Sequence, residues 1–317
     1  MSASVVLPLS DRLPWLETAR ASLDQAVSQD RLPHAVLLQA SAGLGGEWLA
    51  SWLAARIFCP TVCGHCLSCR RVAAREHPDL QWLTPEGSSE IRIEQVRALI
   101  EQFSLTRHGT GRKVAILTPA DRLNRHAANA LLKTLEEPSG DSLLVLVTAK
   151  PARLPATIAS RCLRLAVAPP PVSEIVEWLD QKQSSAAPID WESVLNILGP
   201  APLLALEVDH ERIISLRNAA ADVLRAAKSG TLDPPVIAER WGKDDFPWHI
   251  TALEREVQAL LKQSTLQAEA PASRYWSELL EELAEARRWE ETPINKSLVI
   301  QRLLWRLSAA RSSLGRV

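Results

Sequence analysis

Long apolar runs are absent from this sequence of 317 residues, and their absence limits where the chain can reside. No stretch reaches the roughly 18 consecutive apolar residues that a membrane-spanning helix needs. The N-terminus also lacks a basic region followed by an apolar segment, which is the pattern of a secretory signal. We therefore expect no membrane association and a cytoplasmic location.

An excess of charge of one sign is also missing. Lys and Arg number 36 against 37 Asp and Glu, which gives a formal net charge of −1. Tyr and Phe are scarce, at one and three residues, and no stripe alternates aromatic with basic side chains. The chain therefore lacks the overall features of a nucleic-acid binder, although a local basic patch is compatible with this composition. Its length and its 46% apolar content suit a globular protein of about two or three domains.

Cysteine is rare outside one short segment. Four of the five cysteines, Cys59, Cys63, Cys66 and Cys69, fall within eleven consecutive residues. In a cytoplasmic chain this clustering indicates a metal site rather than disulfides. Two overlapping C-x₂-C steps and a fourth Cys upstream supply thiolates for a closed, structural Zn²⁺ site. Two alternatives remain open: free core thiols, and His65 as a ligand in place of Cys59.

A glycine-rich turn follows the first apolar strand and precedes a predicted helix. A phosphate-binding P-loop at this place reads G-x-x-x-x-G-K-[ST]. Here Ala40 replaces the first Gly, Gly46 replaces the Lys, and Glu47 replaces the Ser or Thr, while Gly43 and Gly45 keep the turn. The Lys that binds β/γ-phosphates and the hydroxyl that binds Mg²⁺ are therefore missing. An ordinary strand-to-helix turn and a P-loop without its phosphate chemistry both fit this sequence.

Strands alternate with amphipathic helices across the first half of the chain. A first helix is expected over 12–29, with Asp11 as its N-cap. The expected strands span 35–39, 80–83, 114–117, 142–147 and 163–167. This alternation predicts an α/β domain with a parallel sheet covered by helices on both faces. The third strand ends in Thr118-Pro119, where a P-loop ATPase carries the Asp-Glu pair that holds Mg²⁺ and polarises water.

The second half of the chain follows a run of prolines. Pro169-Pro170-Pro171 forms a stiff segment that lacks backbone donors, and we expect a domain boundary there. From about residue 210 onward the apolar residues recur at helical spacing, which predicts an all-α bundle.

Three motifs together resemble the bacterial DNA polymerase III clamp loader, a family of AAA+ proteins. They are Asn-Ala-Leu-Leu-Lys-Thr-Leu-Glu-Glu-Pro at 129–138, the cysteine cluster at 59–69, and Ser-Arg-Cys at 160–162. Among the subunits of this family, the chain resembles the ATPase-inactive delta prime type. The phosphate Lys, the Mg²⁺ hydroxyl and the Asp-Glu pair are absent at matching positions, and Ala201-Pro202 offers no sensor Arg.

The resemblance implies a three-part fold of the class α/β plus all-α. We expect an AAA+ α/β domain over 1–168 with a zinc-binding insertion, a small helical lid domain over 169–211, and a C-terminal helical collar domain over 212–317. The zinc cysteines of the family match the four clustered cysteines of this chain. The gap between Cys59 and Cys63 is shorter than in relatives, so Cys59 is the least typical ligand.

The resemblance also implies a role for Arg161, which lies between Ser160 and Cys162. In the family this Arg is an arginine finger, which acts in trans on the ATP of a neighbouring subunit; a surface Arg at a strand start is the alternative. The expected partners are the gamma/tau ATPase and delta subunits in a hetero-pentamer, and through them the sliding clamp and primer-template DNA. Structural Zn²⁺ is expected, and bound ATP is not.

No activity is expected from the isolated chain, although the DNA polymerase III holoenzyme is a DNA-directed DNA polymerase, a nucleotidyltransferase. Two other functions are weighed against this one. An ATP-hydrolysing subunit of the gamma/tau type would need a Lys and a carboxylate from elsewhere in the chain. A zinc-dependent DNA-binding module would show DNA affinity that falls steeply with salt.

Overall fold

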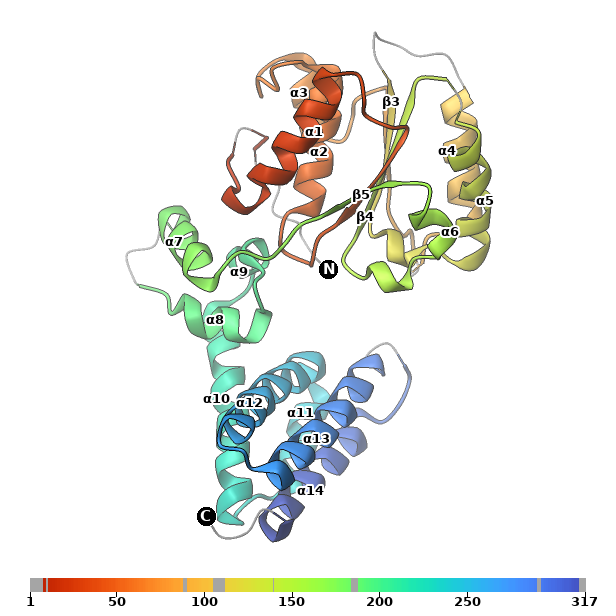
Figure 1. The fold of residues 1–317 in the computed structure, drawn as a ribbon. Coiled ribbons are helices and arrows are strands. Elements are labelled where there is room, and N and C mark those ends of the chain that lie inside the picture. Colours follow the sequence, from red (N-terminus) through yellow and green to blue (C-terminus); the bar gives the residue numbers. More distant parts are fainter. Residues whose placement is uncertain are drawn as a thin grey trace. The chain divides into compact units, whose positions relative to one another are not determined.

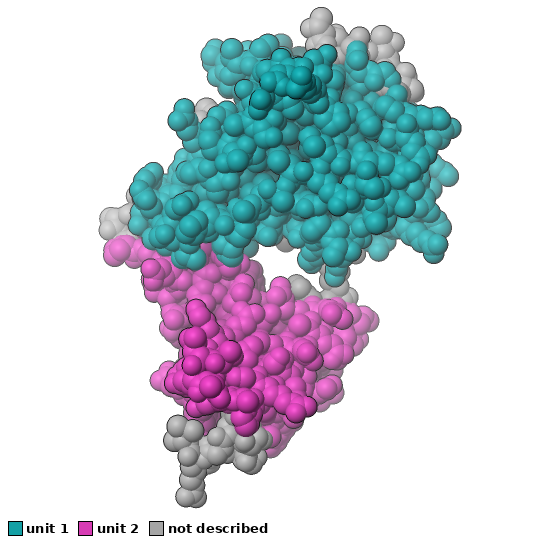
Figure 2. Space-filling view, viewed as in Figure 1, with its two compact units in different colours: residues 1–182, 200–207 teal, residues 183–199, 208–317 magenta. Residues whose placement is uncertain are grey.

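A computed structural model describes residues 8–9, 11–87, 90–104, 112–138, 140–183, 188–289 and 292–313. Contacts between residues divide the chain into two units (Figure 2). Unit 1 comprises residues 1–182 and 200–207, and unit 2 comprises residues 183–199 and 208–317. Within the described residues, no helix combines the length and the apolar character needed to cross a lipid bilayer.

Unit 1 is built on a five-stranded, wholly parallel sheet. Its strands lie in the order β2-β3-β4-β1-β5. The bounds are β1 Ala35–Gln39, β2 Leu80–Leu83, β3 Lys113–Leu117, β4 Ser142–Thr148 and β5 Leu163–Ala166. The expected strands agree with these bounds within one residue at each end. The α/β class with a parallel sheet is therefore confirmed.

Helices cover both faces of this sheet. On one side of the sheet lie α1 Glu17–Ser28, α2 Gly46–Phe58 and α3 Leu67–Ala73 (Figure 1), with α2 in contact with β1 and β4 and the other two in contact with α2. The other face packs against α4 Ile93–Ser104, α5 Arg125–Glu136 and α6 Ala156–Ala159 (Figure 1). On this second face, alternate strand residues such as Leu37, Leu117 and Leu146 join one buried cluster with α4 and α5. Alternation of side chains along each strand thus feeds two apolar layers.

Short elements complete unit 1. They are the 3₁₀ helices η1 Pro14–Leu16, η2 Ala120–Arg122 and η3 Pro151–Arg153, with the helices α7 Val172–Lys182 and α9 Pro202–Glu207. The expected N-cap role of Asp11 is wrong. The chain enters α1 through η1, whose cap is Leu13, and the Asp11 carboxylate instead accepts a hydrogen bond from Lys182 Nζ at 2.8 Å.

The regular elements of unit 2 are all helices in the part that the structure describes. It contains α8 Trp191–Leu198, α10 His210–Ser229, α11 Pro234–Lys243, α12 Phe246–Leu266, α13 Ala270–Arg288 and α14 Lys296–Ser313. Asp190, Asp209 and Asp233 cap α8, α10 and α11 through side-chain acceptors for a backbone N–H three residues on. The core includes Trp241, Leu279 and Leu304, so the predicted all-α bundle is confirmed.

The predicted lid segment 169–211 is divided between the units. Helices α7 and α9 belong to unit 1, whereas α8 belongs to unit 2. The three-domain division at 168 and 211 stays a prediction. The assignment of α9 to unit 1 matters for function, because α9 contacts the glycine-rich turn described next.

Candidate functional site

The glycine-rich turn links β1 to α2 and keeps the backbone shape of a phosphate-binding loop. Gly43 and Gly45 have φ of +78° and +87°, in the left-handed region that glycine adopts at little cost. Leu49 N–H donates to Gly45 O at 2.9 Å, so the helical bonding begins there. The backbone N–H groups before it, at 46–48, have no partner within the helix.

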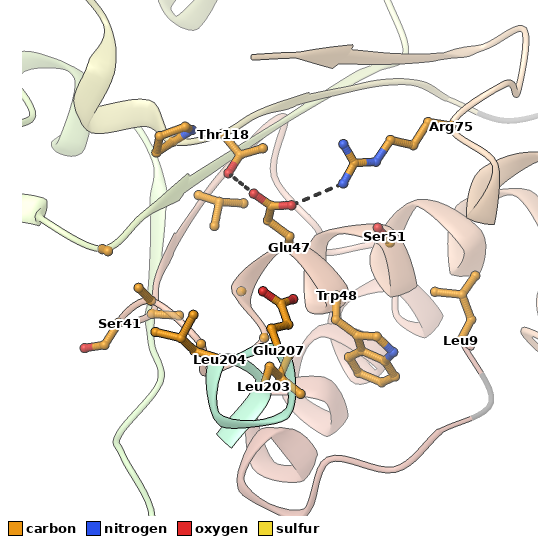
Figure 3. A pocket seen from close by; sticks show the side chains of 18 of the residues that line it. Leu9, Ser41, Glu47, Trp48, Ser51, Arg75, Thr118, Leu203, Leu204 and Glu207 are labelled. Carbon is orange, nitrogen blue, oxygen red and sulfur yellow. Dashed lines mark hydrogen bonds and ion pairs between the residues drawn. The ribbon is translucent and has the colours of Figure 1, made fainter. Parts of the chain in front are cut away.

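Glu47 stands where a P-loop has Ser or Thr, and its side chain bonds to other residues of this chain. Glu47, the second residue of α2, accepts a hydrogen bond from Thr118 Oγ1 at 3.0 Å and pairs with Arg75 Nη2 at 3.2 Å. Figure 3 shows its carboxylate between the Thr118 hydroxyl and the Arg75 guanidinium. Thr118 follows β3 directly, at the place where an ATPase carries a Mg²⁺-binding carboxylate. A hydrogen bond between residues 47 and 118 thus joins the start of α2 to the end of β3.

A cavity of about 290 Å³ opens beside this turn. Its wall includes Ala40, Gly43, Gly45, Gly46 and Glu47, so the structure gathers every residue that the sequence assigned to the altered P-loop. Thr118-Pro119 closes one side. The other side is formed by Leu203, Leu204 and Glu207 of α9 (Figure 3).

Helix α9 contacts the turn directly. Leu203 N–H donates to Gly43 O at 3.0 Å. A Cβ atom built on Gly43 would lie 2.7 Å from Ala201 Cβ, so a side chain at this position would overlap the segment before α9. Ala201 therefore packs on the glycine-rich turn. From the sequence, this residue was noted only because it offers no sensor Arg.

Sequence reasoning missed Arg75. It follows α3 in the left-handed conformation, with φ +60°, and its guanidinium lies 3.9 Å from the centre of the Trp82 ring. The residue is 28 positions from Glu47, its ion-pair partner. No local pattern links the two, because the segment between them includes the whole cysteine cluster.

The four clustered cysteines form a second candidate site. The Sγ atoms of Cys59, Cys63, Cys66 and Cys69 all lie within 4.8 Å of one another, and the Cys59 and Cys63 sulfurs are 3.8 Å apart. A tetrahedron with Zn–S bonds of about 2.3 Å has edges of about 3.8 Å, so this donor set fits Zn²⁺. Gly64, with φ +77°, makes the tight turn between the second and third ligands.

Backbone amides and burial set the protonation of these thiols. The backbone of Cys63 lowers the pKa of Cys59 to about 6, and the Cys66 N–H, 3.4 Å from the Cys63 sulfur, lowers the pKa of Cys63. Burial raises the pKa of Cys69 to about 12. Amides that point at sulfur favour thiolates, the form that binds metal.

His65 does not join the cluster. Its Nδ1 atom lies 2.8 Å from Cys63 O, and its side chain is exposed. The sulfur of Cys59, by contrast, lies with the other three. The geometry therefore favours Cys59 over His65 as the fourth donor. The ligand types alone could not decide between these two residues.

Arg161 lies apart from both candidate sites, in the turn between α6 and β5. Its Nη1 donates to Thr157 O at 2.9 Å, and its Nη2 lies 2.5 Å from Glu136 Oε1 at the end of α5. The side chain is 36% exposed. Ser160 Oγ donates to Thr157 O, and the thiol of Cys162 donates to Ile158 O; burial raises the pKa of Cys162 to about 11. Arg161 is thus an accessible cation held in one orientation.

Comparison with known proteins gives consistent matches. A family model described as DNA polymerase III, delta subunit, matches residues 15–171. The DNA polymerase III subunit delta′ of Pseudomonas aeruginosa is 34% identical over 245 residues, which cover 75% of this chain and 74% of that protein. The DNA polymerase III subunit tau of Escherichia coli is 33% identical over 153 residues, which cover 47% of this chain and 24% of that protein.

Among solved structures, a gamma subunit-related protein of DNA polymerase III from Thermotoga maritima shares the fold. Its TM-score is 0.50 at 18% identity, over 95% of this chain and 100% of that one. The likeness of that structure concerns the fold alone. The similarity to the Pseudomonas aeruginosa protein covers about three quarters of both chains at 34% identity, and on that ground the chain belongs to the DNA polymerase III subunit delta′ family.

Proposed function

We propose that this chain is a clamp-loader subunit that neither binds nor hydrolyses ATP and that offers Arg161 to the nucleotide of a neighbouring ATPase subunit. This proposal rests mainly on the position of Glu47. Its carboxylate bonds to Thr118 and Arg75 in the cavity where an active site would place a Mg²⁺-binding hydroxyl and carboxylate. A carboxylate there repels phosphate rather than binding it.

Arg161 has the features that a trans-acting cation needs. Guanidinium is charged at all physiological pH values and carries several donors that match phosphate oxygens. Arg161 is partly exposed, and its contact with Glu136 is a surface ion pair. Such pairs contribute about 0–1 kcal/mol, so a neighbour's γ-phosphate can replace Glu136 at low cost.

The expected partners are an ATPase subunit of the gamma/tau type and a delta subunit. Similarity to the tau subunit over 47% of the chain supports membership of one assembly built from related modules. In that assembly the chain would act on the sliding clamp and primed DNA indirectly, through its neighbours, in the cytoplasm.

Zinc would be held by Cys59, Cys63, Cys66 and Cys69. Four protein thiolates leave no open coordination position, so the ion would be structural. It would fix the loop between α2 and α3, and with it the start of the segment that carries Arg75.

The test is an ATPase assay on the reconstituted complex with Arg161→Ala. Removal of an arginine finger should lower turnover at the site it serves by roughly 10³-fold, whereas complex assembly should be unchanged. Arg164→Ala is the matched control, since Arg164 is an exposed Arg three residues away that donates to Ala159 O. An unchanged rate with Arg161→Ala rules out the finger, and ATP hydrolysis by the isolated chain rules out the silent-subunit role.

A further inference from the structure

Gly46, the first residue of α2, has no room for a side chain. A Cβ atom built there would lie 2.9 Å from Val147 Cγ1 and 3.0 Å from Ala40 Cβ. Contacts this short between carbon atoms require one partner to move. Val147 is 6% exposed near the end of β4, and Ala40 is 6% exposed directly after β1, so neither partner moves easily.

The two positions in contact are the ones at which the P-loop pattern requires glycine and lysine. In G-x-x-x-x-G-K-[ST] the first position is Gly and the seventh is Lys. This chain has Ala40 at the first position and Gly46 at the seventh. This chain thus has a side chain at position 40 and none at position 46, the reverse of the pattern. The Ala40 methyl group fills space that a lysine Cβ at position 46 would need.

The backbone of the loop is otherwise retained. Gly43 and Gly45 keep positive φ, the helical bonding of α2 starts at Leu49 N–H, and a cavity of about 290 Å³ remains in front of the turn. Side chains, rather than a collapsed loop, thus block the site.

We propose that Ala40 locks this loop against the phosphate-binding lysine, and that Glu47 closes what remains of the site. Lysine fits at position 46 only after Ala40 becomes glycine, because the N-terminal turn of α2 then gains room to move away from Val147. No single substitution restores nucleotide binding. This inference deepens the proposed function and rests on it, since it names the groups that keep the subunit silent.

The steric part is tested on the full chain by thermal unfolding. Gly46→Ala should lower Tm by roughly 5 °C, a typical effect of overpacking in a chain of this size. In the Ala40→Gly background the same substitution should cost little. Ala35→Gly is the matched background, because Ala35 is a fully buried alanine at the other end of β1, and there the cost should stay unchanged. An equal cost in all three backgrounds overturns the lock.

The nucleotide part is tested by calorimetric titration with ADP and with ATP plus Mg²⁺. The chain with Gly46→Lys and Glu47→Thr should bind both nucleotides at least 10-fold more weakly than the same chain with Ala40→Gly added. Equal affinity with and without Ala40→Gly overturns the proposal, as does the absence of binding in the triple variant. Tight ATP binding by the unsubstituted chain would instead refute the proposed function, and the unfolding experiment would still decide whether Ala40 and Gly46 are coupled.

Discussion

Glu47 shows how one side chain changes the electrostatics of a glycine-rich turn. The loop before it has two glycines with positive φ, Gly43 and Gly45, and it lines the cavity together with the start of α2. Its carboxylate, bonded to Thr118 and Arg75, places negative charge on the wall of this cavity. The exposed Arg75 pair adds little stability, so its effect is to orient Glu47 rather than to hold the fold.

His249 is the residue at which pH should act on stability. It stacks on Trp241 with ring centres 4.3 Å apart, and its buried Nδ1 has no hydrogen-bond partner among the described residues. Burial lowers the pKa of His249 from 6.5 to about 4. The unfolded chain therefore binds more protons between these values, so stability is full above about pH 6.5 and falls as pH drops towards 4, by at most about 3 kcal/mol.

Urea unfolding of the full chain at pH 7, 5.5 and 4 measures this loss. His249→Phe keeps the stacked ring without the titrating group, so its stability should fall less over the same range. His126→Gln, at an exposed position in α5, should behave like the unsubstituted chain. Equal pH slopes for the chain and for His249→Phe would show that His249 is not protonated during unfolding.

At the scale of elements, the contact between the glycine turn and α9 fixes one wall of the cavity. Gly43→Ala should destabilise unit 1 by about 2–4 kcal/mol, because a left-handed Ala costs about 1 kcal/mol and the overlap with Ala201 adds about 1–3 kcal/mol. Gly87→Ala isolates the first term, since Gly87 also has positive φ, at +60°, but a Cβ there meets no atom of the described residues within 4 Å.

The measurement is the difference in free energy of unfolding between these two variants. A clearly larger loss for Gly43→Ala supports the packing of the segment before α9 on the turn. If both variants lose the same amount, the close approach of Ala201 to Gly43 does not occur in solution.

At the scale of the whole molecule, the cysteine cluster belongs to unit 1 alone. We expect one zinc per chain by metal analysis, lost on Cys69→Ser but kept on Cys162→Ser, because only the first thiol lies in the cluster. Chelation should raise amide hydrogen exchange around residues 59–75 and leave α10 to α14 unchanged.

A preparation that contains no metal and yet exchanges as slowly at 59–75 would contradict the zinc assignment. Faster exchange throughout both units would show instead that the metal supports the whole chain. The Cys162→Ser variant controls for the loss of a partly buried thiol as such.

The sequence by itself determined the elements and most of the chemistry. Strand bounds followed from apolar runs, because side-chain periodicity is set by near neighbours along the chain. Cys59 to Cys69 form a cluster because short C-x₂-C spacings leave few other geometries. The absence of the P-loop Gly, Lys and Ser or Thr could be read at positions 40, 46 and 47 from residue types alone.

Only the tertiary structure decided which residues contact Glu47 and the glycine-rich turn. Glu47 meets Thr118 across 71 positions of sequence, a contact that depends on the order of strands in the sheet. Arg75 enters the cavity because α3 returns the chain to it, and Asp11 serves α7 instead of capping a helix. The contact of Ala40 with the space above Gly46 is visible only in three dimensions, because steric exclusion acts between atoms close in space, whatever their separation in the chain.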